Sequence, residues 1–265
     1  MSKIIQGKFK ILSNKKVGPG YWKMVIAAPE IARAASPGQF VHLLCQAQGP
    51  EPLLRRPFSF HRIGKDRFQI LYQAIGRGTK LLAQRKKGER IDVLGPLGTG
   101  FEIVLDQTAD QILVAGGMGV APLVALAEKL NKIHRRSKTL VLIGARTKKE
   151  LLCANEFKKL GCQVQIATDD GTHGYKGLIT DLVKKVLKLL ALNSQLCAIY
   201  SCGPKPMLKE LARVSKQYRA KALGSLEEKM ACGVGACLGC AVKTRRGFKK
   251  VCQDGPVFNL AEIQW

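Results

Sequence analysis

The sequence lacks any apolar run of the roughly 18 residues that a membrane-spanning helix needs. Its first residues, MSKIIQGKFKIL, lack the apolar stretch and small-residue cleavage site of a secretory signal. Low-complexity tracts and repeats at solenoid spacing are also missing. Hydrophobic residues nevertheless make up 46% of the 265 residues, enough for a substantial core. We therefore expect a soluble, cytoplasmic protein of two compact domains, or of two domains and a small module.

Acidic residues are scarce: 19 Asp and Glu stand against 44 Lys and Arg, a formal charge of +25. Such a charge first suggests a nucleic-acid partner. Aromatic residues, however, are only 6% of the chain, and no nucleic-acid-binding motif frames the basic residues. We predict a solvated basic surface that partly serves anionic cofactors or an acidic partner, without specific nucleic-acid binding. The basic residues are spread over KKVGPGYWK, QRKKGER, HRRSK, KKVLK and KTRRGFKK.

The first hundred residues consist of short β-branched and aromatic runs, most of them separated by Gly or Pro. This pattern predicts a small antiparallel β-barrel over residues 1–104. Over residues 105–221, short apolar strands alternate with amphipathic helices, which predicts a parallel sheet covered by helices on both faces. The periodicity stops near Ala222, and a cysteine-rich module fills residues 222–265. The fold class is therefore multi-domain, β followed by α/β.

Glycines punctuate the first strand–helix unit of the α/β segment, in LVAGGMGVAPL. Gly116, Gly117 and Gly119 would let the backbone approach a pyrophosphate, and the following helix would present free N–H groups. This is not the full dinucleotide fingerprint, so an ordinary tight turn stays open on these residues alone. The position in a parallel sheet favours the nucleotide.

Two further loops fit phosphates or planar rings, although each by itself also fits an ordinary structural role. SCGPKPML ends the last predicted strand, where a doubly wound sheet opens its ligand crevice. In LRRPFSF, Arg56 can grip a phosphate with its forked guanidinium, Phe58 can face a planar ring, and Ser59 can reach a flavin nitrogen. Gly78 and Thr79, in LYQAIGRGT, are predicted at a turn with exposed N–H groups and a hydroxyl.

Four of the nine cysteines crowd the carboxyl end. The spacing Cys232-x4-Cys237-x2-Cys240 followed by a distant Cys252 is that of plant-type [2Fe-2S] sites. Zinc is the main alternative, but zinc sites more often use two C-x2-C pairs and this segment has one. Nine cysteines without a secretory signal argue against a disulfide framework. We expect the remaining five to be small buried residues: Cys45, Cys153, Cys162, Cys197 and Cys202.

Taken in order, RPFS, GRGT, GPLGTGF, AGGMGVAP and SCGPKPM resemble the ferredoxin reductase-like flavoproteins, which pair an FAD-binding barrel with a nicotinamide-nucleotide domain. The tail, LEEKMACGVGACLGCAVK and VCQDGPVF, is similar to that of electron-transfer subunits of class B dihydroorotate dehydrogenases. Both resemblances together span essentially the whole chain.

The resemblance implies three cofactors: FAD, a [2Fe-2S] cluster and NAD. The FAD residues would be Arg56, Pro57, Phe58, Ser59, Leu71, Tyr72, Gln73, Gly78 and Thr79. The NAD residues would be Gly116, Gly117, Gly119, Cys202, Gly203 and Pro204. The cluster ligands would be Cys232, Cys237, Cys240 and Cys252, and no catalytic acid or base is assigned.

The resemblance also implies a role in pyrimidine (UMP) biosynthesis. Electrons would pass from the FMN of a separate catalytic subunit, which oxidises dihydroorotate, through the cluster and FAD to NAD+. The two subunits would assemble as a heterotetramer of two of each. Lys243, Arg245, Arg246, Lys249 and Lys250 are expected at the rim of the contact with the partner.

Three questions stay open on the sequence. The chain can instead be the reductase subunit of another flavin and iron–sulfur complex, such as an NADPH-ferredoxin transhydrogenase or a sulfhydrogenase. A basic, zinc-stapled nucleic-acid-binding protein is the non-enzyme alternative. Arg146, after the second strand of the α/β segment, is compatible with NADP, whereas the resemblance implies NAD.

Overall fold

The computed structural model describes residues 3–46, 51–104, 110–133, 139–192 and 197–265. The basic segment 134–138 and the start of the predicted second domain at residue 105 lie outside these ranges. The chain divides into two compact units with separate sheets. The barrel unit comprises Met1–Gly100, Glu228–Ala241 and Lys249–Pro256, and the α/β unit comprises Phe101–Glu227, Val242–Phe248 and Val257–Trp265.

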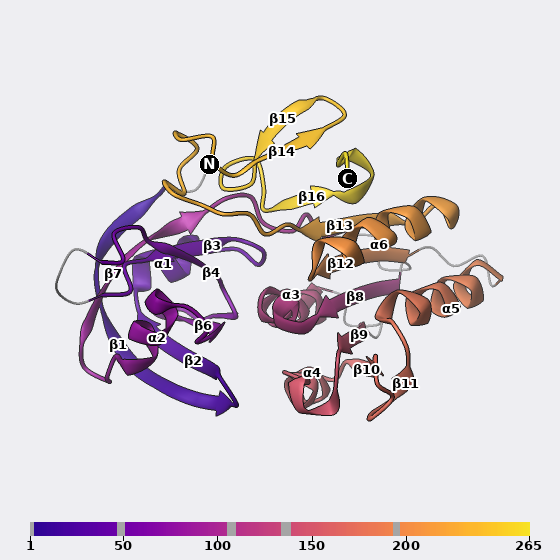
Figure 1. Ribbon diagram of the computed structural model, residues 1–265, viewed down its shortest axis with the longest axis horizontal. Helices are drawn as coiled ribbons and strands as arrows, with labels where there is room; N and C mark the ends of the chain where they lie inside the picture. Colours follow the sequence, from indigo (N-terminus) through magenta and orange to yellow (C-terminus); the bar gives the residue numbers. More distant parts are fainter. Residues whose placement is uncertain (1–2, 47–50, 105–109, 134–138, 193–196) are drawn as a thin grey trace. The chain divides into compact units, whose positions relative to one another are not determined.

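The barrel unit contains a seven-stranded sheet in which every pairing is antiparallel, as the sequence predicts (Figure 1). Its strand order is β4-β3-β7-β1-β2-β6-β5. The elements are β1 (Ile5–Gly18), β2 (Tyr21–Ala27), α1 (Pro29–Ala34), β3 (Phe40–Leu43), β4 (Arg56–Ser59), β5 (Arg62–Ile63), β6 (Arg67–Gln73), α2 (Arg77–Gln84) and β7 (Arg90–Leu97).

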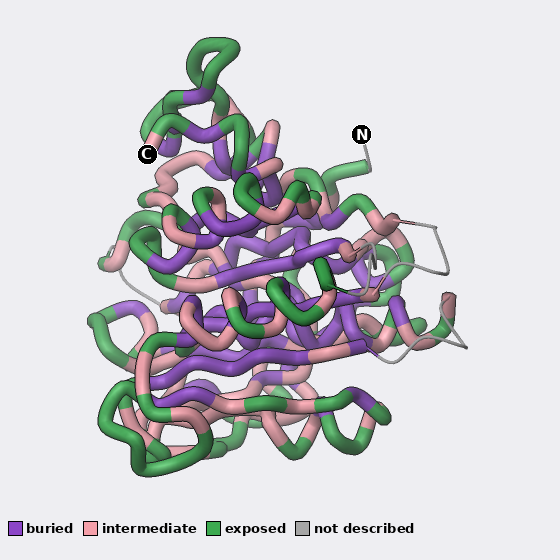
Figure 2. Tube along the Cα trace, turned by 90° about the vertical axis from the view of Figure 1, so that its right-hand side faces the viewer, coloured by how far each residue is buried: buried purple, intermediate pink, exposed green. Residues whose placement is uncertain are grey.

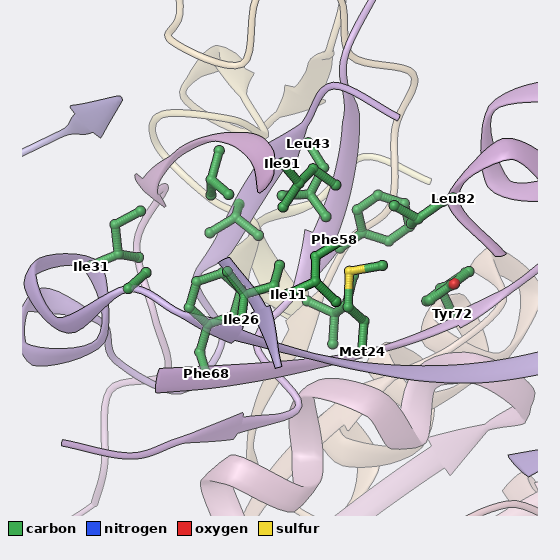
Figure 3. Close-up of a cluster of buried hydrophobic side chains, with 14 of the residues drawn as sticks. Ile11, Met24, Ile26, Ile31, Leu43, Phe58, Phe68, Tyr72, Leu82 and Ile91 are labelled. Carbon is green, nitrogen blue, oxygen red and sulfur yellow. The ribbon is translucent and has the colours of Figure 1, made fainter. Parts of the chain in front are cut away.

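Alternation of side chains along these strands builds the core of the barrel unit. Phe68, Ile70 and Tyr72 occupy every second position of β6 and share one face of the sheet, because successive side chains of a strand point to opposite faces. All three are buried, and Leu71 between them is buried as well. The three meet residues of the neighbouring strands, such as Met24 and Ile26 of β2, in one apolar cluster (Figure 3).

The α/β unit contains a sheet of order β11-β10-β9-β8-β12-β13-β16, parallel except for the antiparallel pair β13–β16. Helices α3 and α4 pack against each other, and so do α5 and α6. The strands are β8 (Asp110–Gly116), β9 (Leu140–Ala145), β10 (Gln163–Thr168), β11 (Tyr175–Lys176), β12 (Cys197–Cys202), β13 (Lys221–Ser225) and β16 (Val257–Asn259). The helices are η1 (Gly117–Gly119), α3 (Val120–Ile133), η2 (Lys148–Glu150), α4 (Ala154–Lys159), α5 (Ile179–Leu192), α6 (Lys205–Gln217) and η3 (Leu260–Glu262).

The first strand of this unit, β8, lies at its centre with β9 on one side and β12 on the other. The chain therefore reverses its winding direction at β8, and the carboxyl ends of β8 and β12 flank the topological switch point, where doubly wound sheets bind ligands. Along the chain, buried residues are concentrated in strands and exposed residues in the connecting turns (Figure 2).

One predicted helix is shorter than the sequence pattern suggests. The run ELLCANEFKKLG, residues 150–161, has the pattern of one amphipathic helix, but α4 begins only at Ala154. Cys153 has a left-handed φ of 60°, which a right-handed helix cannot include. No helix in the described part of the chain is both long and apolar enough to cross a membrane.

The cysteine segment between β13 and β14 contains no helix or strand among its described residues and packs with the barrel unit. It leads into a two-stranded sheet of β14 (Ala241–Thr244) and β15 (Gly247–Lys250). Only Val251 separates β15 from Cys252, and the N–H of Val251 donates to the Cys240 carbonyl at 3.1 Å. The β14–β15 hairpin thereby brings Cys252 close to Cys240.

Candidate functional site

The amino-terminal turn of α2 has the features of an anion site. Gly78 and Thr79, predicted at a turn with exposed N–H groups, lie in this first helical turn. A Cβ on Gly78 would lie 3.5 Å from Nε of Arg56, so the guanidinium stem passes directly over the helix terminus. Free N–H groups, the positive end of the helix dipole and a fixed arginine together suit a phosphate.

The Thr79 hydroxyl, however, serves the loop before the helix. Its oxygen accepts from the N–H groups of Ile75 and Gly76, both at 3.1 Å. The hydroxyl thus fixes the chain just before α2. The turn can present the backbone N–H groups of α2 to an anion.

Strand β4 separates its residues between two faces. The Phe58 ring is buried in the core of the barrel unit and contacts Tyr72 edge-on, with ring centroids 5.7 Å apart (Figure 3). The Phe58 ring therefore packs inward, and strand alternation leaves Pro57 and Ser59 on the opposite face. The assignment of Phe58 to a planar cofactor stays a prediction.

Tyr72 also has a structural contact. Its hydroxyl donates to Oδ1 of Asn14 at 2.9 Å, and the Asn14 amide donates to the carbonyls of Leu82 and Arg85 at 2.9 and 3.0 Å. Burial raises the pKa of Tyr72. This network ties β1 and β6 to the carboxyl end of α2, and so holds the helix whose amino terminus meets Arg56.

All of the predicted nucleotide residues converge at the carboxyl ends of β8 and β12. A Cβ on Gly119 would lie 1.9 Å from the Cys202 carbonyl oxygen, and one on Gly203 would lie 3.0 Å from the Gly116 nitrogen. Only glycine permits this approach of two backbones. The Gly117 φ of +54° likewise favours glycine. Two loops far apart in sequence thus form one backbone-lined site before α3.

Cys202 lies at the end of β12, beneath these loops. Burial raises the pKa of its thiol, and the carboxylate of Glu227 raises it further. The thiol is therefore neutral at physiological pH and acts as a small apolar group. Glu227 carried no sequence signal, because its proximity to Cys202 arises only when β13 pairs with β12.

The four carboxyl-terminal cysteines form two linked pairs within the barrel unit. The N–H of Cys237 lies 3.4 Å from Sγ of Cys232, and the N–H of Cys252 lies 3.4 Å from Sγ of Cys240. None of the nine cysteines, all of which lie in the described ranges, forms a disulfide. Hydrogen bonds from backbone N–H groups to sulfur are among the features that tune iron–sulfur clusters.

The thiol pKa values fit the same chemistry. Burial alone would raise the pKa of Cys232, but the backbone N–H groups of Cys237, Val234 and Ala236 outweigh it and lower the pKa to about 6. Burial and the adjacent Cys240 sulfur raise the pKa of Cys252 to about 12. Cys232 therefore forms a thiolate readily, whereas Cys252 needs a bound cation to lose its proton.

Tight packing fixes the backbone of this loop. Gly233 and Gly235 have φ values of +73° and +84°, and a Cβ on Gly235 would lie 2.3 Å from Oε1 of Gln253. The Lys250 ammonium donates to the Gly235 carbonyl at 3.1 Å. Lys250, expected at the rim of a partner surface, therefore holds the loop itself.

A histidine that the sequence did not single out faces this loop from β3. His42 is fully buried, and a Cβ on Gly233 would lie 2.5 Å from its Cε1 atom. Burial, followed by the charges of Arg55 and Arg56, lowers the pKa of His42 to about 4, so the ring is neutral. A polar residue within the apolar run FVHLL was the one available sequence signal.

A cavity of about 470 Å³ borders the same loop within the barrel unit. Gly233, Val234 and Cys252 form its wall on the cysteine side, and Gln39 and Gly98 line it from the sheet. The cavity gives access to the cysteine site from one side.

The fold and these sites define a reductase with an FAD-type antiparallel barrel, a doubly wound nucleotide domain and an iron–sulfur tail. Residues 227–264 match the iron–sulfur cluster binding domain of dihydroorotate dehydrogenase B, and residues 113–213 match an oxidoreductase NAD-binding domain. The four carboxyl-terminal cysteines lie within the first match, and the two glycine loops lie within the second.

Named relatives show to which family of reductases the chain belongs. The chain is 39% identical over 271 residues to the dihydroorotate dehydrogenase B (NAD(+)) electron transfer subunit of Desulforamulus reducens, with full coverage of both chains. It is 40% identical over 263 residues to that of Bacillus mycoides, with 96% of each chain covered. The chain belongs to this family of electron transfer subunits, and it is an oxidoreductase subunit that works with a catalytic partner.

Solved structures agree with the fold. An NADH-dependent reduced ferredoxin-NADP oxidoreductase superposes with a TM-score of 0.84 at 28% identity, covering 98% of this chain and 90% of that one. A ferredoxin NADP+ reductase from Neisseria gonorrhoeae with bound FAD and NADP superposes with a TM-score of 0.65 at 21% identity, covering 80% and 91%. The second comparison supports the fold alone.

Proposed function

We propose that this chain transfers electrons between the FMN of a dihydroorotate-oxidising partner and NAD+, with a [2Fe-2S] cluster and FAD as its own cofactors. The observation that carries the proposal is the paired arrangement of Cys232, Cys237, Cys240 and Cys252, with backbone N–H groups at two of the sulfurs. When bound, FAD exchanges electron pairs with a nicotinamide and single electrons with an iron–sulfur cluster.

The residues of the chain bind and orient these groups. We assign the four cysteines as cluster ligands, and the turn of α2 with Arg56 as the pyrophosphate clamp of FAD. We assign the rest of the flavin contact to the other predicted residues of β4 and β6: Pro57, Phe58, Ser59, Leu71, Tyr72 and Gln73.

NAD is assigned to the two glycine loops at the ends of β8 and β12. The helix α3 directs its amino terminus at the same place, which favours a pyrophosphate. A free Arg146 guanidinium would favour NADP. Here it already donates to both carboxylate oxygens of Glu150, at 3.0 and 2.8 Å, and this pairing favours NAD. A 2′-phosphate would have to compete with this carboxylate.

We propose a cytoplasmic complex of two copies of this chain and two copies of an FMN-containing catalytic subunit. Val234, Leu238 and Cys237 are exposed on the cysteine loop and give the partner an apolar contact at the cluster. On the hairpin β14–β15, the cations Lys243, Arg245, Arg246 and Lys249 are exposed. Charge of one sign on this hairpin suits an acidic partner surface.

Co-purification with the catalytic subunit tests the proposal directly. The complex should contain FAD and two irons per cluster and should reduce NAD+ when dihydroorotate is added. A complex that oxidises dihydroorotate but leaves NAD+ unreduced would refute it. Rapid mixing tests the order of the cofactors: NADH should fail to reduce the cluster in protein stripped of FAD.

The similarity to the NADH-dependent reduced ferredoxin-NADP oxidoreductase supports a second candidate, a reductase subunit that exchanges electrons with ferredoxin. NADPH-driven reduction of ferredoxin by the purified complex, without any response to dihydroorotate, would favour it. An absorption spectrum without flavin and iron–sulfur bands would refute both reductase functions and favour a basic, zinc-binding nucleic-acid-binding protein.

A further inference from the structure

His42 is a buried polar side chain without a protein partner. It is 0% exposed, and neither Nδ1 nor Nε2 has a hydrogen-bond partner among the described residues. Leaving a buried donor or acceptor unpaired costs about 1–3 kcal/mol, and native proteins almost always pair such groups. A partner from outside the polypeptide therefore fits this ring.

The direction of the ring shows where that partner lies. A Cβ on Gly233 would lie 2.5, 2.7 and 2.9 Å from Cε1, Nδ1 and Nε2 of His42. These three atoms form one edge of the imidazole, so the edge with both nitrogens faces Gly233. Because Gly233 follows Cys232, His42 meets the cysteine loop one residue after its first cysteine.

The neighbours of His42 on the sheet do not compete for its N–H group. Opposite His42 on β4 is Pro57, which has no N–H and whose side chain is apolar, and on β7 the register places Leu94. On the same face of β3, the ring of Phe40 lies with its centroid 5.7 Å from that of His42. None of these three side chains offers the ring a hydrogen-bond acceptor, and the edge with both nitrogens faces the cysteine loop at Gly233.

We propose that the ring N–H of His42 donates a hydrogen bond to a sulfur of the cluster and thereby raises the reduction potential of the cluster. The inference rests on the proposed ligand set of Cys232, Cys237, Cys240 and Cys252. A hydrogen bond to sulfur stabilises the reduced cluster more than the oxidised one, because the reduced cluster carries more negative charge. His42 therefore favours acceptance of an electron at this site.

A redox titration followed by the EPR signal of the reduced cluster tests this role. In the purified holoprotein, His42→Leu should lower the ratio of reduced to oxidised cluster about tenfold at a fixed potential, which is about 59 mV for one electron. His42→Gln keeps an N–H donor and should recover part of this shift. Phe40→Leu, a change of a neighbouring ring on the same face, should leave the potential unchanged.

A His42→Leu protein with its full iron content and an unchanged potential would overturn the proposal. A second measurement covers the case in which that variant loses the cluster. In wild-type holoprotein grown with 15N-labelled histidine, pulsed EPR of the reduced cluster should detect a 15N coupling that is absent in His42→Gln.

A wild-type cluster signal without any histidine 15N coupling would refute the role of His42 and leave the proposed function intact. A wild-type protein without a [2Fe-2S] signal would refute the proposed ligand set, and the inference with it.

Discussion

At Gly233 the cysteine loop closely approaches the sheet of the barrel unit. Its φ is +73°, and a Cβ there would lie 2.5 Å from the buried ring of His42. Nothing larger than hydrogen fits without displacing either the ring or the loop.

We expect Gly233→Ala to lower the iron content of the purified protein and its unfolding midpoint, because backbone strain alone costs about 1–3 kcal/mol. Iron assay and thermal unfolding measure the two effects. Gly239→Ala is the matched control, because a Cβ there would meet its nearest atom, Sγ of Cys237, only at 3.6 Å, an ordinary contact. Equal iron content in both variants would contradict the prediction.

A second prediction concerns the side chain of Glu150, which holds Arg146 after β9. Glu150→Gln removes the charge that occupies the guanidinium, so Arg146 can bind a 2′-phosphate. We expect the preference for NAD over NADP, measured as the ratio of kcat/KM values, to fall about tenfold, as one charge-assisted hydrogen bond of about 1.5 kcal/mol implies.

Lys149→Gln, a neighbouring change on η2 that leaves the Arg146–Glu150 pair intact, is the control for this variant. If Glu150→Gln leaves the ratio unchanged, Arg146 does not face the 2′ position of the nucleotide.

At the scale of elements, a carboxylate links helices α5 and α6. Glu210 of α6 accepts from Arg213 at 2.9 and 2.7 Å and pairs with Lys184 of α5 at 2.9 Å. The hydrogen bonds from Arg213 and then Lys184 lower the pKa of Glu210 from 4.5 to about 2. A lowered carboxyl pKa stabilises the fold above the unfolded-state value, and this stabilisation is lost as the pH falls towards 2.

Glu210→Gln should therefore lower the free energy of unfolding by about 0.5–1 kcal/mol at pH 7, a small value because the pair is near the surface and screened. The difference from wild type should shrink as the pH falls from 4.5 towards 2, and also at high salt. Urea unfolding across this pH range measures it, with Glu30→Gln on α1 as the exposed control. A difference that grows on acidification would contradict the assignment.

At the scale of the whole molecule, the net charge of +25 includes the cations of the hairpin β14–β15, which we propose to contact an acidic surface of the catalytic subunit. Arg245→Glu/Arg246→Glu should slow association with the catalytic subunit about tenfold at low salt, and the deficit should diminish as salt screens it. Stopped-flow association at several salt concentrations measures both effects.

The double variant Lys188→Glu/Lys209→Glu changes the net charge equally on α5 and α6, away from the hairpin in sequence. An equal slowing in both double variants would show that only the net charge matters and that the hairpin is not the contact.

Local sequence patterns predicted much of this architecture. Period-two alternation in β6 and the strand–helix alternation after residue 110 each follow from which side chains must be buried, so both sheets were predictable. The spacing of Cys232, Cys237 and Cys240 likewise predicts a cluster loop, because ligands close in sequence are constrained to be close in space. The division of the chain at residues 104 and 221 stays a prediction.

Contacts between distant segments were not predictable in this way. The Phe58 ring packs inward against Tyr72 because strand alternation, set by the whole sheet, assigns it to the core. Lys250 looked like a free surface cation, but its ammonium reaches the Gly235 carbonyl only because the hairpin folds back.

By itself, the sequence determined the order of the cofactor segments, the identity of the four cysteines and the glycines that phosphate loops require, because these depend on neighbours along the chain. Only the tertiary structure decided that Gly119 meets Cys202, that the cysteine loop packs with the barrel unit and that His42 faces Gly233. Those contacts depend on strand order and on the packing of backbones without side chains, and no local pattern encodes either.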